Sequence, residues 1–414
     1  MRDKILTNLD KPGELERLYR SDKTNFRQEF NGVYPEISGQ SVAGFWHERL
    51  NYEADENLRV SGKDLAFVVI AALLAGLIAK IPAIFGIEEE FFYPRNISFI
   101  VFPFLMAWFA WKRKAGNKLI LILSAATIIS AFYINSLPPD TGSDTLLLAC
   151  IHLPLFLWMV LGLSFTGNEP KNLLRRLDFL RYNGDLVVMS AIILLAGGLL
   201  SAVSFGLFEL IDISIEKVFS EYVVVWGLAA VPILGTYLVQ SNPQLVGKVS
   251  PVIAKVFTPV VLVTLVIYLL AVMITGKDPY NDREFLLIFN LLLLGVMALI
   301  LFSVVETTGN SRTRLNIMML LGLSLVTVII NGIALSAILF RISEWGFTPN
   351  RIAVLGGNIL ILSNLLIVVY RLFQSVRKKG DTRSVGLSIA AFLPIYSIWT
   401  FLVAFLFPVL FNFE

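Results

Sequence analysis

A series of long apolar blocks, each about 20 residues in length and almost free of charge, constrains this chain more than any other feature. A helix of that length crosses the hydrocarbon core of a bilayer. Within hydrocarbon the backbone must satisfy its own hydrogen bonds, so each block is expected to be helical. Charged residues make up only 16% of the chain, against about 25% in soluble domains. We therefore expect an all-α, polytopic transmembrane helix bundle, which excludes a soluble enzyme, a nucleic-acid-binding protein and a secreted disulfide scaffold.

The ends of the apolar blocks predict about eleven membrane spans, of which the second is the shortest. Strands of a membrane β-barrel would alternate apolar and polar residues, and these blocks do not. The predicted spans are residues 65–85, 97–111, 119–137, 146–165, 186–208, 223–239, 252–275, 285–305, 315–340, 352–373 and 385–411.

The first 64 residues differ from the rest because they are rich in charge and their apolar residues recur at helical intervals. Phe26 and Phe30, for example, are spaced to share one face of a helix. We expect residues 1–64 to form a small helical cytosolic segment, followed by a transmembrane domain over residues 65–411. Such a short segment buries little core alone, so it is expected to pack against the membrane domain or bind a protein partner.

Two short patterns recur within the apolar blocks. The sequence Leu-Leu-Ala-Gly occupies residues 73–76 and again 194–197, and Phe-x-Pro occupies 257–259 and 392–394. A four-span unit used about three times, over residues 65–165, 186–305 and 315–411 with the last copy truncated, would explain both pairs. The alternative is that Leu, Ala and Gly recur by chance in apolar helices.

The connectors between the predicted spans alternate in charge. Basic residues such as Arg175 and Arg176 concentrate in every second connector, whereas the intervening connectors are acidic, as at Glu88, Glu89 and Glu90. Basic connectors stay on the cytoplasmic side of a membrane. The N-terminus is therefore predicted to be cytoplasmic and the C-terminus extracytoplasmic.

Uncharged polar residues within the predicted spans are the candidates for a substrate-lining site. Asn331 and Asn364 lie near the middle of their blocks, Asn358 follows a Gly-Gly pair, and His152 lies in the fourth block. The alternative is that these groups bond to a neighbouring helix, as polar groups in bundles do. No Asp or Glu lies within a predicted span, which argues against transport driven by an intramembrane carboxylate.

The connector after the ninth span carries the outer-loop candidates Arg341, Glu344 and Arg351. These three side chains are predicted to form an ion-pair cluster or to bind an anionic headgroup, with an anchored loop as the alternative. Thr348 precedes Pro349 and is expected to cap the next helix, because proline is favoured at the first helical position.

The stretch Trp-Gly-Phe-Thr-Pro-Asn-Arg at residues 345–351, followed by a glycine-containing span, resembles the bacterial membrane proteins catalogued as domain of unknown function 4153. The resemblance covers most of the membrane region and implies a multi-pass protein of the bacterial cytoplasmic membrane. It supplies no catalytic residue and no substrate.

Sequence motifs for bound cofactors are absent: there is no phosphate-binding loop, dinucleotide fingerprint or zinc-hydrolase motif. The single cysteine, Cys150, is expected to be a small buried hydrophobe. We expect no cofactor, no metal and no nucleic-acid partner, and the sequence does not specify an oligomeric state.

Three functions remain open. The first is a permease-like transporter of a solute or lipid, which the mid-membrane polar residues favour. The second is a membrane sensor or scaffold subunit that docks a partner through residues 1–64. The third is a membrane enzyme acting on a lipid-linked substrate, for which no catalytic residue can be named.

Overall fold

The computed structural model divides into two compact units, Met1–Val60 and Ser61–Glu414, and each is described by itself. All elements within the described residues are helices, which confirms the all-α fold class. The structure describes residues 2–21, 23–51, 62–140, 142–209, 215–241, 258–267, 269–270, 274, 283–306, 314–378 and 383–413.

The N-terminal unit contains four helices around a hydrophobic core of its own. Phe26, Phe30 and Trp46 lie at its centre, with the Phe26 and Trp46 ring centroids 5.3 Å apart. The segment thus buries more core than its length alone led us to expect, while its cytosolic location stays a prediction. Its helices are α1 (Arg2–Thr7), α2 (Pro12–Ser21), α3 (Lys23–Ile37) and α4 (Ser41–Asn51).

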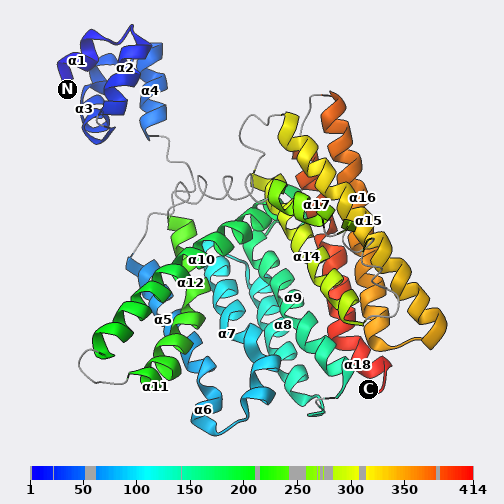
Figure 1. Ribbon diagram of the computed structural model, residues 1–414. Coiled ribbons are helices and arrows are strands. Elements are labelled where there is room, and N and C mark those ends of the chain that lie inside the picture. The colour runs from blue at the N-terminus through cyan, green and yellow to red at the C-terminus, as the bar shows by residue number, and fades with distance from the viewer. Residues whose placement is uncertain are drawn as a thin grey trace. The chain divides into compact units, whose positions relative to one another are not determined.

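The second unit is a bundle of long helices (Figure 1). Its first half comprises α5 (Gly62–Ala79), α6 (Ile81–Phe85), α7 (Glu89–Lys112), α8 (Asn117–Ser136), α9 (Asp144–Thr166), α10 (Leu173–Glu209), α11 (Glu216–Val218), η1 (Phe219–Val224) and α12 (Val225–Ser241). Its second half comprises α14 (Arg283–Glu306), α15 (Arg314–Trp345), α16 (Pro349–Lys378), α17 (Arg383–Phe401), η3 (Leu402–Leu406) and α18 (Phe407–Leu410).

Among the described residues, 8 helices are long and apolar enough to cross a membrane. The other predicted spans correspond to α7 and to two shorter apolar helices, so the count of eleven stays a prediction. Part of the predicted span 252–275 lies outside the described residues. The eight helices are Gly62–Ala79, Asn117–Ser136, Asp144–Thr166, Leu173–Ala202, Glu216–Ser241, Asn316–Trp345, Pro349–Arg377 and Ser384–Leu410, and the shorter two are Thr258–Ile267 and Leu293–Val304.

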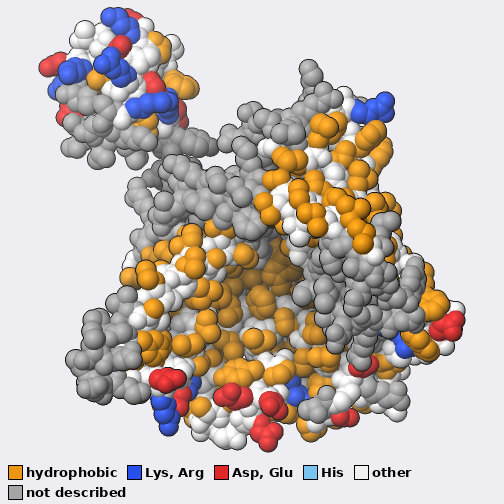
Figure 2. All heavy atoms as spheres, viewed as in Figure 1, with side chains coloured by type: hydrophobic (Ala, Val, Ile, Leu, Met, Phe, Trp, Pro, Cys, Tyr) orange, Lys and Arg blue, Asp and Glu red, His pale blue; other side chains and the backbone are white. Residues whose placement is uncertain are grey.

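Apolar side chains cover the outside of this unit as well as its interior. Phe132 is 78% exposed and Leu195 is 75% exposed. On the face that Figure 2 shows, apolar side chains cover most of the described surface of this unit, while charged side chains gather at its ends. Such a surface matches hydrocarbon and not water, so the unit has the surface of an integral membrane protein.

The polar start of α7 contains Arg95, which the sequence had placed in an outer connector. The structure places Arg95 within the helix at 4% exposure, where its guanidinium donates to the carbonyl oxygens of Phe91 (3.3 Å) and Pro138 (3.2 Å). The side-chain amide of the next residue, Asn96, exchanges two hydrogen bonds with that of Asn135 on α8, at 2.9 and 2.8 Å. These bonds hold the start of α7 against the end of α8. They explain why this segment is helical, although its polar residues had predicted a connector.

Tight helix contacts form where an aromatic ring lies on a glycine. An added Cβ on Gly76 of α5 would lie 2.6 Å from Cδ2 of Trp226 on α12. Gly197, its counterpart in the repeated Leu-Leu-Ala-Gly pattern, has no neighbour within 4 Å among the described residues, and neither has Gly198. The described residues thus show close packing at Gly76 and none at the Gly197-Gly198 pair, and the internal repeat stays a prediction.

Replacing Gly76 by alanine is expected to lower stability by about 1–3 kcal/mol, because the rigid Trp226 ring must shift. Gly197→Ala is the matched control, and it is expected to be neutral or stabilising by up to about 1 kcal/mol, because alanine favours a helix over glycine. Thermal unfolding midpoints of the two variants in detergent measure this difference. Equal shifts would contradict the described α5–α12 contact.

Candidate functional site

Three buried asparagines lie on α15 and α16, which pack side by side as an antiparallel hairpin (Figure 1). Asn331 and Asn364 are 0% exposed and Asn358 is 3% exposed. Only residues 346–348 separate the two helices, and Asn331 and Asn364 are nearly equally far along the chain from that turn. The structure therefore places Asn331 and Asn364 at the same depth in the hairpin, near the middle of both helices.

Most of the polar atoms of this cluster lack hydrogen bonds. Asn364 donates through Nδ2 to the hydroxyl of Tyr396 on α17, at 3.0 Å. No partner within the described residues bonds Oδ1 of Asn364, either amide atom of Asn331, or Nδ2 of Asn358. Each buried polar group left unbonded costs about 1–3 kcal/mol. The unbonded amides therefore lower the stability of the fold. Buried polar groups of this kind in membrane helices are candidates for a functional site.

The third helix of the cluster, α17, also contributes Trp399. Its ring packs on Gly356, where an added Cβ would lie 2.1 Å from Cη2, and its Nε1 has no partner within the described residues. Because Gly356 has no side chain, the indole ring of Trp399 fits between α16 and α17. Neither Tyr396 nor Trp399 stands out in the sequence, because a single aromatic residue in an apolar helix is common. The Gly356-Gly357 pair is the sequence feature that indicates a close contact there.

Helix α17 is irregular on both sides of Tyr396 and Trp399. Pro394 lies within the helix, and a π-helical turn, η3, follows at Leu402–Leu406. Proline removes a backbone donor, and π-turns occur frequently at functional sites. The hydroxyl of Tyr133 on α8 donates to the carbonyl oxygen of Phe405, at 2.7 Å, which satisfies one group of the irregular turn. Interrupted helices of this kind line the binding sites of many transporters.

His152, the fourth substrate-lining candidate, lies in α9 and is partly buried. Its Nδ1 lies 2.9 Å from the carbonyl oxygen of Leu148, one turn earlier in the same helix. This bond holds the ring against its own helix, which fits a packing role. Its predicted contact with a substrate stays a prediction.

The turn between α15 and α16 is shorter than the sequence indicated, since Arg341 still belongs to α15 and Arg351 already belongs to α16. Arg351 donates to the carbonyl oxygens of Trp345 (2.8 Å), the last residue of α15, and Gly346 (2.7 Å), the residue that follows it. Its backbone N–H donates to Oγ1 of Thr348 at 3.3 Å, which confirms the predicted helix cap. Arg351 therefore closes the hairpin at this end.

The three outer-loop candidates do not share one cluster. The guanidinium groups of Arg341 and Arg351 lie over the Trp345 ring, 5.8 and 5.7 Å from its centroid. Glu344 is exposed, and within the described residues it forms no ion pair with Arg351. Binding of an anionic headgroup at this turn stays a prediction.

No protein-family model, curated protein or solved structure matches this chain. The resemblance to the domain of unknown function 4153 proteins therefore stays a prediction. Among the described residues, no group of three or more His, Cys, Asp or Glu side chains lies close enough to hold a metal ion. A function for this chain must therefore be inferred from the geometry of the site itself.

A double-mutant cycle tests the bond between α16 and α17. Tyr396→Phe and Asn364→Leu are expected to show a coupling energy of about 0.6 kcal/mol, the average for hydrogen bonds between membrane helices. Unfolding free energies in detergent measure it. Tyr370→Phe on α16, whose ring is 58% exposed, is the control and is expected to show no coupling to Asn364→Leu. Zero coupling for Tyr396 would show that the bond is not formed.

Proposed function

We propose that this protein is a permease-like transporter of a small uncharged solute, which the amides of Asn331 and Asn364 bind inside the bundle. The observation that carries the proposal is the set of buried, unbonded polar atoms on α15, α16 and α17. A purely structural polar pair would bond across the helices. Among the described residues only the Asn364–Tyr396 bond does so, and we infer that the remaining donors and acceptors are available to a ligand.

The chemistry of the cluster favours an uncharged ligand with both donors and acceptors. Asn331 offers one amide donor group and one acceptor, Asn364 offers an acceptor, and Trp399 offers a donor. None of these side chains carries a charge. A charged ligand would lose its hydration shell here without a counter-ion, which is far more costly than burying a bonded amide or hydroxyl.

The described conformation is closed around the site, because Asn331 and Asn364 have no exposed surface. Transport then requires a second conformation in which the cluster opens to one side. Helix α17 is the element that we expect to move, because Pro394 and the π-turn at Leu402–Leu406 interrupt its hydrogen-bond ladder.

Asn331→Leu and Asn364→Leu are expected to separate function from stability. Each variant removes ligand-binding groups, so solute flux should fall at least about tenfold, the cost of roughly one hydrogen bond. Unfolding midpoints of Asn331→Leu should stay equal or rise, because an unbonded amide is replaced by an apolar group of similar size. Light-scattering measurements of proteoliposomes under osmotic shock, with a panel of polyols, amides and sugars, report the flux.

The control for these variants is Ser363→Ala, one residue from Asn364. Ser363 is exposed and its hydroxyl donates to Ile359 of its own helix, at 2.8 Å, so flux should not change. Equal flux through wild type, Asn331→Leu and Asn364→Leu would refute transport through this site.

The predicted scaffold role is the second candidate, and the separate hydrophobic core of the N-terminal unit favours it. A unit with its own core can present a docking surface without help from the membrane helices. A scaffold predicts that deletion of residues 1–60 releases a copurifying protein and leaves solute flux unchanged.

We further propose a bacterial cytoplasmic membrane location with the N-terminus in the cytoplasm, on the basis of the charge of the connectors. In a Cys150→Ala background, an impermeant maleimide added to intact cells should label Glu89→Cys and should not label Arg175→Cys. Permeabilised cells should show labelling of both. The reverse pattern would invert the orientation.

A further inference from the structure

The N-terminal unit contains a groove that neither the transport proposal nor the helix packing explains. Its volume is about 530 Å³, and it lies between α2 and α4. Charged side chains line it together with apolar ones, and they include Glu16, Arg20, Phe45, Trp46 and Arg49. Small-ligand and peptide sites combine apolar walls with a few placed polar groups in this way.

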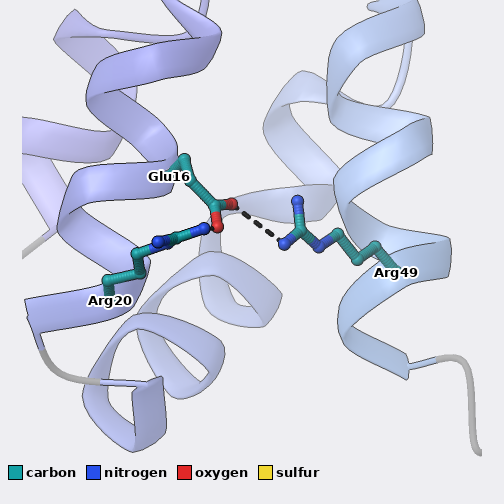
Figure 3. Close-up of polar contacts among 3 residues, drawn as sticks. All are labelled: Glu16, Arg20 and Arg49. Atoms are coloured by element: carbon teal, nitrogen blue, oxygen red, sulfur yellow. Dashed lines mark hydrogen bonds and ion pairs between the residues drawn. The ribbon is translucent and has the colours of Figure 1, made fainter. Parts of the chain in front are cut away.

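Two arginines converge on one carboxylate along the groove (Figure 3). Nε of Arg20 lies 2.8 Å from Oε1 of Glu16, and a terminal nitrogen of Arg49 lies 2.9 Å from Oε2. Arg20 comes from the same helix as Glu16, whereas Arg49 reaches across from α4. Each guanidinium has five N–H donors, so one carboxylate leaves donors on both arginines for a second anion.

The backbone adds to the positive potential of the groove. Pro12 and Ser41, the first residues of α2 and α4, both line it. Helix N-termini carry partial positive charge and unbonded N–H groups. With two arginines and a single glutamate among its charged lining residues, and two helix starts at its wall, the groove favours an anion.

The apolar part of the groove is suited to a side chain and not to a free ion. Phe45 is 64% exposed, and Trp46 beside it is 3% exposed and belongs to the core. The Arg49 guanidinium lies over the Trp46 ring, 4.6 Å from its centroid, which holds the guanidinium in one orientation. Trp and Arg are the residue types that most often dominate binding energy at protein interfaces.

We propose that this groove binds an acidic peptide segment of a partner protein, with a carboxylate between Arg20 and Arg49 and a neighbouring apolar side chain against Phe45. The forked guanidinium geometry matches a carboxylate. A concave groove admits a single strand of peptide, whereas a flat anionic membrane surface would reach only its rim. The proposal does not depend on transport activity.

Glu16 acts in this arrangement as an internal competitor for the partner carboxylate. The hydrogen bond from Arg20 is the largest cause that lowers the pKa of Glu16 below its usual 4.5, and the charge of Arg49 lowers it further. Glu16 is therefore ionised at neutral pH and occupies donors that the peptide would use. Removing its charge should strengthen peptide binding, which a merely structural role for the three residues does not predict.

Fluorescence anisotropy of a labelled peptide that alternates Asp and Leu, titrated with full-length protein in neutral-lipid nanodiscs, tests the proposal. Arg20→Gln and Arg49→Gln should each weaken binding about tenfold or more, as expected for a lost charged hydrogen bond. Glu16→Gln should tighten it severalfold. Phe45→Ser should weaken binding without loss of fold, because the ring is largely exposed.

The matched control is Arg17→Gln, which removes the same charge from the same helix. Arg17 is 81% exposed in its side chain, pairs with Glu14 and does not line the groove, so binding should not change. A peptide with Asn in place of Asp should not bind. Equal weakening by Arg17→Gln, tight binding of the Asn peptide, or no binding of the Asp peptide would overturn the proposal. Arg49-dependent binding to phosphatidylglycerol vesicles without peptide binding would replace it with a membrane-surface role.

Discussion

A polar group inside hydrocarbon has no water to bond, so it must find a partner in the protein or remain costly. In the first half of the membrane unit several polar groups meet this constraint through bonds between helices, although Oγ of Ser98 and the indole N–H groups of Trp108 and Trp226 have no partner within the described residues. Oγ of Ser164 donates to the carbonyl oxygen of Met106 at 2.6 Å, and Nε1 of Trp158 donates to Asn183 at 2.8 Å. Each such bond joins two helices, and together they hold α7, α9 and α10 in register. The amides of Asn331, Asn358 and Asn364 differ because they concentrate several unbonded atoms on two neighbouring helices, and this concentration calls for an explanation.

Packing in this unit cannot rely on the hydrophobic effect between helices, since lipid tails are as apolar as leucine side chains. Close contact and dispersion must hold the bundle, which explains why indole rings lie on glycines. Trp226 on Gly76 and Trp399 on Gly356 are two instances, far apart in the sequence. In both instances the indole N–H has no partner within the described residues, and Trp399 lies on α17, the helix that also bonds Asn364 through Tyr396.

Much of this fold could be predicted, because block length and apolar composition are local properties. The helices, the Thr348 cap and the burial of Asn331 and Asn364 followed from them. Arg95 did not, because it is kept within α7 by the carbonyl of Pro138, 43 residues away. Tyr396 was missed for the same reason: its role depends on which face of α17 meets α16. Neither contact produces a periodic pattern in the sequence. Likewise, no local motif distinguishes Gly356, which the Trp399 ring covers, from Gly197, which has no neighbour within 4 Å among the described residues.

Arginine has opposite roles in the two units because its surroundings differ. Arg95 is buried, and two of its guanidinium nitrogens donate to backbone carbonyls, while its Nε has no partner within the described residues. Exchanging the two carbonyls for a ligand would leave the charge in a low dielectric. The Arg20 side chain is 75% exposed and that of Arg49 is 40% exposed, and water screens their pairs with Glu16 so that the pairs contribute little to stability. A weak exposed pair is easily exchanged for another carboxylate. The arginines that matter least for the fold are therefore the ones available for recognition.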